Sequence, residues 1–498
     1  MSNLSELLPS GGGAKSATFV ASGTLPNGKP VILKTNGQVE LVALSPVTES
    51  IPSGSASVFH TSSVEYATVA YDPNTANKFI TVYKNSTTTY GTAVVGTVSG
   101  NSISFGTPTV FNTAATNYIE IAFDPYTADK FAIVYSNAGN SGAGTAIVGA
   151  VSGTSLTFGS PQVFNTGFTA LFGFAFDSNT VNRLLVTYYD AGNSNYGTAL
   201  SGLIFSTNLI SWGSEVVFNS ATTINTEVQF DPNTAQKFVV SYKDNGNNAY
   251  GTTKVGTLSG SAISFNGAAH VFNPASTGEF ISLSFDPNTA NKFVVAYLDA
   301  ANSNYGTARV GTVSGTSISY GSEYVFNAGS TSYISVRFNP NTANQFVIVY
   351  NDTANSQHGT AIVGTVSGTA ISFGSEYVFN SAATIYTRIS FDPNTIGKFV
   401  INYYNGGNTD GEAILGQLVA PSLTNLTSTN FLGITDEAIA SGASGSVVVE
   451  GGVGAGQTSL TIGSTYYVQT NGTISTVSTS PAVNIGKALS ATTILLKG

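Results

Sequence analysis

The sequence has no cysteine and few charged residues. The absence of cysteine excludes disulfides, thiolate nucleophiles and cysteine-ligated metal centres. Asp, Glu, Lys and Arg make up 9% of the 498 residues, whereas an average globular protein has about 25%. The net charge is −9 and no Lys/Arg cluster occurs, which argues against a nucleic-acid partner because phosphate binding depends on basic side chains. Stability must therefore come from packing and hydrogen bonds.

Long hydrophobic runs are also lacking. No stretch approaches the length of about 18 apolar residues that a membrane-spanning helix needs, so we expect no membrane insertion. Residues 1–15 have neither the basic start nor the apolar run of an ordinary signal peptide, so export by that route is not expected. The chain is instead rich in Gly and β-branched residues, with 24 Tyr and 30 Phe, a composition that favours β-strands.

A repeat of about 53 residues occupies the middle of the chain. The tetrapeptide Asp-Pro-Asn-Thr, or a close variant, begins at Asp72, Asp124, Asp177, Asp231, Asp286, Asn339 and Asp392. Proline sets the second position of a turn, and Asp and Asn side chains bond nearby backbone amides, so we interpret the element as a turn. A calcium site is the weaker alternative, because one carboxylate in each loop is far from the six to eight oxygen ligands required.

Each copy contains four short segments in which apolar and polar residues alternate. In the fifth copy they are residues 280–285, 292–298, 306–313 and 317–326. Alternation with a period of two indicates half-buried antiparallel strands. Four such strands in each copy predict the blades of a β-propeller, with the large side chains of one sheet packed on the small side chains of the next.

The seventh copy lacks a fourth strand, and the missing strand occurs at the other end of the chain. Residues 50–60 (SIPSGSASVFH) align without a gap with residues 370–380 (AISFGSEYVFN), the fourth strand of the sixth copy. Pro52 fits this position because an outermost strand tolerates proline. The sequence therefore predicts an all-β protein with a seven-bladed β-propeller over residues 47–420, closed by an N-terminal strand.

The two ends of the chain, residues 1–46 and 421–498, lie outside the repeat. Hairpin signals occur at Asn27-Gly28 and Asn36-Gly37, and a similar order of strand, Thr-Asn-Gly turn and strand returns within residues 463–474. We expect the N-terminal and C-terminal halves to form one small β-module, with the propeller inserted between them.

The ends also resemble a known group of proteins. The segments LLPSGGGAK (7–15), GTLPNGKPVILKTNGQV (23–39) and GKALSATTILLKG (486–498) resemble the terminal modules of virion structural proteins of tailed phages, particularly marine and cyanobacterial ones. Residues 19–37 and 431–452 together resemble small β capsid-decoration proteins. The resemblance does not extend to the propeller. It implies a protein of the virion, docked on capsid or tail proteins through its terminal module and released by lysis rather than by a signal peptide.

Candidate ligand residues lie in the loops between the second and third strands of the repeat. These loops present Asp and Asn side chains beside an aromatic ring or a histidine: Asp190, Asn193, Tyr196, Asp244, Asn247, Tyr250, Asp299, Asn302, Tyr305, Asp352 and His358. A sugar has an apolar face and a ring of hydroxyls, which such a surface suits, so glycan binding is one hypothesis. The alternatives are that these residues only shape the turns, or that they bind a metal.

Catalytic patterns are not apparent. No pair of carboxylates is singled out by its spacing, and the three histidines form no recognisable triad or metal set. We therefore predict no enzymatic activity, no cofactor and no metal. If the first strand of each copy is innermost, polar residues of that strand line the central channel: Glu120, Gln229, Ser284, Arg337 and Ser390.

Together these observations lead to an expected function. The chain is expected to be a surface or appendage protein of a virion, anchored by its terminal β-module and displaying the propeller for attachment to a host-surface glycan. Its partners would be other virion proteins, and a homo-oligomer is expected. The alternatives are an architectural capsid-decorating or tail protein without a ligand, and a spike that degrades polysaccharide.

Overall fold

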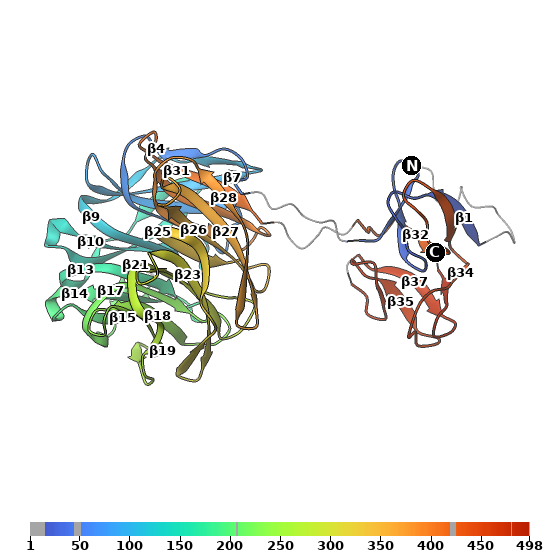
Figure 1. The fold of residues 1–498 in the computed structure, drawn as a ribbon. Coiled ribbons are helices and arrows are strands. Elements are labelled where there is room, and N and C mark those ends of the chain that lie inside the picture. The colour runs from blue at the N-terminus through green and yellow to red at the C-terminus, as the bar shows by residue number, and fades with distance from the viewer. Residues whose placement is uncertain (1–14, 44–50, 206–207, 419–424, 480, 498) are drawn as a thin grey trace. The chain divides into compact units, whose positions relative to one another are not determined.

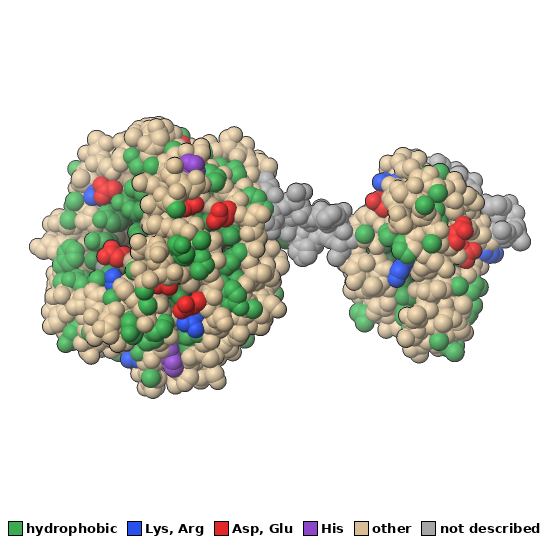
Figure 2. Space-filling model, viewed as in Figure 1, with side chains coloured by type: hydrophobic (Ala, Val, Ile, Leu, Met, Phe, Trp, Pro, Cys, Tyr) green, Lys and Arg blue, Asp and Glu red, His purple; other side chains and the backbone are tan. Residues whose placement is uncertain are grey.

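The computed structural model describes residues 15–43, 51–205, 208–418, 425–479 and 481–497, whose regular secondary structure is almost entirely β-strand (Figure 1). The described residues within Met1–Thr48 and Ala420–Gly498 form one compact unit, called the terminal unit below. Those within Glu49–Val419 form a second, called the propeller unit. None of the helices in the described ranges is long and apolar enough to span a membrane. Charged side chains are sparse on the visible surface of both units (Figure 2).

The propeller unit repeats one antiparallel arrangement of strands along the chain. The second strand of each copy lies between the first and the third, as β22 does between β21 and β23. The first strands are β5 (Val64–Tyr71), β9 (Thr109–Phe123), β13 (Gln162–Phe176), β17 (Val216–Phe230), β21 (His270–Phe285), β25 (Tyr324–Phe338) and β29 (Thr384–Phe391). The second strands are β6 (Lys78–Asn85), β10 (Lys130–Asn137), β14 (Arg183–Asp190), β18 (Lys237–Asp244), β22 (Lys292–Asp299), β26 (Gln345–Asp352) and β30 (Lys398–Asn405).

The outer part of each sheet consists of a third and a fourth strand. The third strands are β7 (Tyr90–Ser99), β11 (Ala143–Ser152), β15 (Tyr196–Ile204), β19 (Tyr250–Ser259), β23 (Tyr305–Ser314), β27 (His358–Ser367) and β31 (Asp410–Gln417). The fourth strands are or include β8 (Ser102–Phe105), β12 (Ser155–Phe158), β16 (Ile210–Trp212), β20 (Ala262–Ser264), β24 (Ser317–Tyr320), β28 (Ala370–Asn380) and β4 (Ser57–His60). Two short 3₁₀ turns, Ala138–Asn140 and Ala191–Asn193, follow β10 and β14.

One feature differs from the separate strands that the sequence predicts. Five first strands are long and belong to two sheets. The first residues of β25 pair with β23, and the residues from Thr331 onward pair with β26. The segment that follows β24, from Tyr324 to Asn327, thus pairs with β23 and runs without a break into the part of β25 that pairs with β26, which joins successive sheets covalently and by hydrogen bonds.

The N-terminal strand pairs with the last sheet. In β4, His60, Val58 and Ser57 lie opposite Gly411, Glu412 and Ala413 of β31. The ring of Phe59 covers Gly411, where a Cβ atom would come within 2.4 Å of the ring, just as Phe326 covers Gly306 in another copy. This is the pairing that the sequence predicts, although Ser50, the first residue of the aligned segment, lies outside the described residues.

The core of the propeller unit consists of interfaces between successive sheets. Phe346, Ile348 and Tyr350 of β26 are fully buried and pack against Val294 and Ala296 of β22. The same packing links the last copy to the first, because Val400 of β30 lies in one cluster with Phe79 and Tyr83 of β6. Large side chains thus fill the small-residue face of the neighbouring sheet, which buries both faces.

The Asp-Pro-Asn-Thr elements are turns that also tie neighbouring sheets together. Asp72 is fully buried; its Oδ1 atom accepts a hydrogen bond from the Asn74 amide at 2.9 Å, and its Oδ2 atom accepts one from the amide of Asp129, in the next copy, at 3.0 Å. Asn394 of the last copy donates to the Pro73 carbonyl of the first at 3.0 Å. Among the described residues no cluster of three or more His, Asp or Glu side chains could hold a metal ion.

The terminal unit contains two five-stranded sheets. The first has the order β1 (Ser16–Val20), β33 (Ser444–Val448), β32 (Phe431–Thr435), β2 (Pro30–Leu33) and β3 (Val39–Leu41). The second has the order β34 (Val453–Gly454), β38 (Ile494–Leu496), β37 (Val483–Ala488), β35 (Thr465–Val468) and β36 (Ile474–Ser475). In the first sheet, strands from the N-terminus pair with strands from the C-terminus. Of the LLPSGGGAK segment, only Lys15 lies within the described residues.

Candidate functional site

The loops that the sequence singles out use their aspartates to shape turns. Asp244 Oδ1 accepts hydrogen bonds from the Gly246 amide at 3.0 Å and from Asn219 Nδ2 at 3.1 Å. The other three aspartates also accept a bond from a backbone amide two or three residues ahead, as the turn interpretation expects: Asp190, Asp299 and Asp352. These three are buried, so little of their surface is free for a ligand.

The remaining candidate residues of these loops are more accessible. The asparagines are exposed: Asn193, Asn247 and Asn302. The rings beside them are half-buried: Tyr196, Tyr250, Tyr305 and His358. Each group belongs to a different sheet, and none of these residues lines the cavity described next. The loops therefore present separate small surfaces rather than one shared site.

A cavity of about 320 Å³ lies between the first strands of the propeller unit. All of its lining residues come from β5, β9, β13, β17, β21, β25 and β29. Its lining residues follow closely after Thr116 and Thr223, which pair with the last residues of β10 and β18, so the cavity lies toward the end of the sheets that carries the candidate loops. Its volume is in the range of small-molecule sites, about 300–1,000 Å³.

Five aromatic side chains follow one another along the wall of this cavity, and we call them the aromatic arc: Phe280, Tyr333, Tyr386, Tyr66 and Tyr118. Their ring centroids are separated in that order by 4.8, 5.3, 5.8 and 5.1 Å. Neighbouring rings are inclined by 44° to 67°, which is the tilted or edge-on packing that aromatic pairs prefer. The arc spans five of the first strands.

The backbone of the arc is strained. Tyr66, Tyr118, Tyr333 and Tyr386 have φ angles of 53°, 49°, 49° and 55°, in the left-handed region that non-glycine residues rarely adopt. Each lies at a β-bulge, where the register between the first and second strands shifts. A residue in this region costs about 1–3 kcal/mol, and bulges of this kind re-aim side chains near functional sites. The recurrence of the strain at the cavity makes the arc a candidate site.

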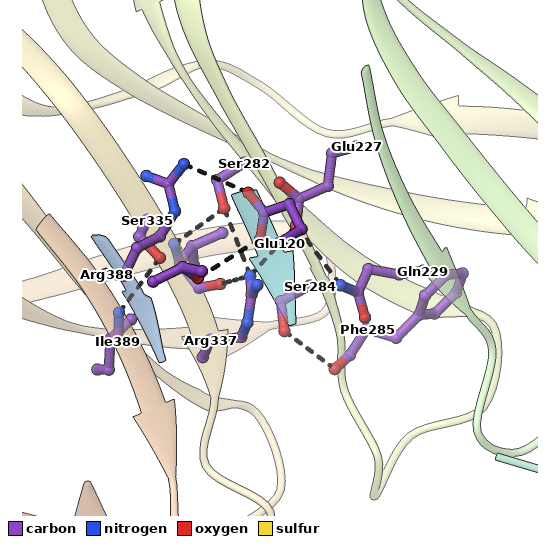
Figure 3. A network of polar contacts seen from close by, with 12 residues as sticks. Glu120, Glu227, Gln229, Ser282, Ser284, Phe285, Ser335, Arg337, Arg388 and Ile389 are labelled. Atoms are coloured by element: carbon purple, nitrogen blue, oxygen red, sulfur yellow. Dashed lines mark hydrogen bonds and ion pairs between the residues drawn. The ribbon is translucent and has the colours of Figure 1, made fainter. Parts of the chain in front are cut away.

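Three charged residues of the lining, Glu120, Glu227 and Arg388, belong to two ion pairs within a network of polar contacts (Figure 3). Arg337 Nη1 lies 3.4 Å from Glu227 Oε1, and Arg388 Nη2 lies 3.7 Å from Glu120 Oε1. Each pair joins first strands of sheets that are not consecutive along the chain, β25 with β17 and β29 with β9. The four side chains retain between 22% and 34% of their exposure, so we expect each pair to contribute less than about 1 kcal/mol to stability. Their groups stay accessible to a ligand.

Burial raises the pKa of two side chains that line the cavity, Glu120 and Tyr66. Burial raises the pKa of Glu120, the charge of Arg388 opposes this shift, and the nearby charge of Glu227 adds to it. Burial also raises the pKa of Tyr66 to about 12, with further contributions from Tyr118 and Glu65. The phenol of Tyr66 is therefore a neutral hydroxyl at physiological pH, able to donate as well as accept a hydrogen bond.

The structure agrees only in part with the channel residues expected from the sequence. Glu120, Gln229 and Arg337 belong to the polar network of the cavity. Ser284 and Ser390 instead accept hydrogen bonds from the amides of Phe338 and Tyr71, on neighbouring first strands. Sequence reasoning missed the aromatic arc. Its signal is an aromatic residue six positions before the turn aspartate or asparagine, present in five copies of the repeat.

No family model and no curated protein matches the chain. Among solved structures, the BP39L lectin from Burkholderia pseudomallei is similar to it with a TM-score of 0.53 and 10% identity, over 74% of this chain and 99% of that chain. Sqt1 from Chaetomium thermophilum is similar with a TM-score of 0.45 and 12% identity, over 76% of this chain and 89% of that chain. At 10% and 12% sequence identity, these comparisons are informative about the fold alone. The strand pairings and the likeness to BP39L establish an all-β fold of the β-propeller type.

Proposed function

We propose that this chain is a non-catalytic attachment protein that binds a host-surface carbohydrate in the cavity between its first strands. The observation that carries this proposal is the aromatic arc beside a carboxylate and guanidinium network, within one cavity of about 320 Å³. Aromatic rings pack on the apolar face of a sugar, and Glu, Arg and Asn side chains bond its hydroxyls. BP39L is named a lectin, but its likeness to this chain is one of fold alone.

The proposal includes the architecture expected from the sequence, with seven blades closed by β4. Three contacts between the ends of the repeat support it: the pairing of β4 with β31, the packing of Val400 on Phe79, and the hydrogen bond from Asn394 to Pro73. We also propose that both ends of the chain form one anchoring module, which the pairing of β1 with β33 and of β2 with β32 supports.

The anchoring role rests on the resemblance of the chain ends to virion proteins of tailed phages. In this proposal the terminal unit docks on capsid or tail proteins, and several copies act together on one particle. Multivalent display would make a weak single site effective, since linked sites gain avidity by factors of about 10² to 10⁴. A purely architectural role is the second candidate, favoured by the use of the loop aspartates in turn structure.

The binding site can be tested with a glycan panel and two matched sets of variants. We expect the whole protein to bind at least one host-derived glycan. The double variant Tyr333→Leu/Tyr386→Leu should weaken this binding at least about ten-fold, because the sugar loses the aromatic faces on which it packs and the arc loses its ring contacts. The triple variant Tyr196→Ala/Tyr250→Ala/Tyr305→Ala should bind like the parent. The opposite pattern would move the site to the loops, and no binding to any glycan would favour the architectural role.

Location and catalysis need separate measurements. Mass spectrometry and antibody labelling of purified particles should detect the protein on the virion surface; its absence from particles would refute the anchoring role and leave carbohydrate binding standing. Incubation with host polysaccharide should release no oligosaccharide. Released fragments would instead establish the polysaccharide-degrading alternative.

A further inference from the structure

One ring of the aromatic arc already faces an ammonium group of the chain itself. Lys84 Nζ lies 5.8 Å from the centroid of the Tyr66 ring and 3.1 Å from Glu65 Oε2. It also donates to Asn117 Oδ1 at 3.2 Å. A cation over an aromatic face and beside a carboxylate is held by both groups at once. In this copy, Glu65 and Tyr66 therefore form an occupied ammonium site.

The fifth copy repeats the carboxylate and the ring without the lysine. Glu279 and Phe280 stand seven and six residues before Asp286, as Glu65 and Tyr66 stand before Asp72. Twelve residues after the same aspartate, Leu298 replaces Lys84. The bulge of β21 contains one residue more than that of β5, so the correspondence is counted from the turn. The pair Glu279 and Phe280 thus has no internal ammonium at the matching position.

The surroundings of Glu279 suit a positively charged group. Glu279 is exposed and lines the cavity, and its carboxylate has no hydrogen bond or ion pair with any residue in the described ranges. The neighbouring Phe280 ring lies 4.8 Å from the Tyr333 ring. Of the three glutamates that line the cavity, Glu120 and Glu227 are paired with Arg388 and Arg337, which leaves Glu279 as the one without an ion pair among the described residues. An ammonium group would gain an unpaired carboxylate and aromatic faces together.

We propose that the cavity recognises its ligand through a compact alkylammonium group, held by the Glu279 carboxylate beside the Phe280 and Tyr333 rings. This inference rests on the proposed function where the ligand is a saccharide, which is then an amino sugar. A quaternary ammonium headgroup such as choline offers the same chemistry from another source. The charge of the ligand, rather than its hydroxyls alone, decides the affinity.

Calorimetric titration of the whole chain with two matched ligand pairs tests the proposal. Glucosamine should bind at least about ten-fold more tightly than N-acetylglucosamine, which has no charge on the same ring. Choline is compared in the same way with its neutral isostere 3,3-dimethylbutan-1-ol. A preference for the charged member of either pair supports the site, whereas equal affinity in both pairs, or no binding of any of the four, overturns it.

Variants test the role of the vacant position. Glu279→Gln should weaken glucosamine binding at least about ten-fold, since the counter-charge is lost while the shape is kept. Leu298→Lys should abolish binding, because its ammonium would occupy the site as Lys84 does in the first copy, and its stem would keep the packing of Leu298. Glu450→Gln, an exposed change in the terminal unit, is the charge-matched control. Thermal unfolding of each variant establishes that it is folded.

The outcomes separate this inference from the proposed function. Binding of choline without any saccharide would support the ammonium site and refute a carbohydrate ligand. Binding of neutral glycans with an unchanged affinity in Glu279→Gln would overturn the ammonium site and leave carbohydrate attachment standing. Unchanged glucosamine binding in a folded Leu298→Lys variant would also overturn it.

Discussion

Two regions of the propeller unit are built by different rules. In the turns and outer strands, the same residue returns in copy after copy: the buried Asp of the turn, and the Phe of the fourth strand, which packs on a Gly of the third. Along the cavity side of the first strands, the residues differ. Where one copy has Thr68, others have Glu120, Glu227 or Arg388. The residues that hold the sheets together thus recur around the unit, whereas the cavity combines a ring that recurs in five copies with a polar position that changes from copy to copy.

The difference has a physical cause. Every sheet meets an equivalent neighbour, so the same packing problem is solved by the same side chains around the unit. A ligand in the middle meets all the first strands at once, and it needs different groups on different sides. Residues of the cavity can therefore be substituted while the scaffold stays folded. The substitutions below compare scaffold and cavity positions, from the largest expected loss of stability to the smallest.

The largest effect is expected at the recurring phenylalanine of β4. Phe59→Ala removes a buried ring that covers Gly411 and should lower the free energy of unfolding by about 3–5 kcal/mol. Val58→Ala, at an exposed position of the same strand, should change it by less than about 0.5 kcal/mol. Urea unfolding followed by tyrosine fluorescence measures both. Equal stability of the two variants would show that β4 is not part of the scaffold.

A smaller loss is expected at the turn. Asp72→Ala leaves the amides of Asn74 and Asp129 without their acceptors in a buried place and should cost about 1–3 kcal/mol. Asp72→Asn should cost less, because Asn339 occupies the same place in another copy and accepts the corresponding bond from the Asn341 amide. Thermal unfolding of the two variants ranks them. A greater loss with Asn than with Ala would refute the acceptor role.

The arc should tolerate change better than the turn. Tyr386→Asn places a residue that adopts positive φ easily at a position with φ of 55°, as Asn225 already does in β17 with φ of 52°. Relief of strain should offset the lost ring contacts, so stability should change by less than about 1 kcal/mol while ligand binding weakens. Differential scanning calorimetry with a binding assay checks both. A loss as large as that of Phe59→Ala would place Tyr386 in the scaffold instead.

The smallest effect is a pH dependence at Glu120. Because burial raises its pKa in the folded state, folding favours the protonated form; the stability that Glu120 contributes is present below its ordinary pKa and is lost as pH rises through the raised one. Glu120→Gln stays neutral throughout. The melting temperature of this variant relative to the parent should therefore increase from acidic to neutral pH, and a difference that falls over this range would contradict the shift.

Much of the scaffold could be predicted because its signals are local or repeated. Alternation of apolar and polar residues identified the strands, and the missing fourth strand of the last copy pointed to residues 50–60. The rings of the aromatic arc also recur, in five copies, but their recurrence alone does not show that they face one cavity. Tyr66 and its counterparts have the spacing of ordinary strand residues, and a bulge with positive φ leaves no mark in the pattern. The continuity of β25 through two sheets was missed for a similar reason, since a bend between sheets does not interrupt the alternation.

The chain's own pattern was enough to predict the strands, the turns and the partner of the N-terminal strand, because each depends on side chains that recur at intervals of 52 to 55 residues. It is only in the tertiary structure that Glu120 pairs with Arg388 and Glu227 with Arg337. These residues lie in copies that are not adjacent in sequence, and their distances are set by the curvature of the whole assembly of sheets. The same holds for the vacant place beside Glu279, since no interval in the sequence records which groups face one cavity.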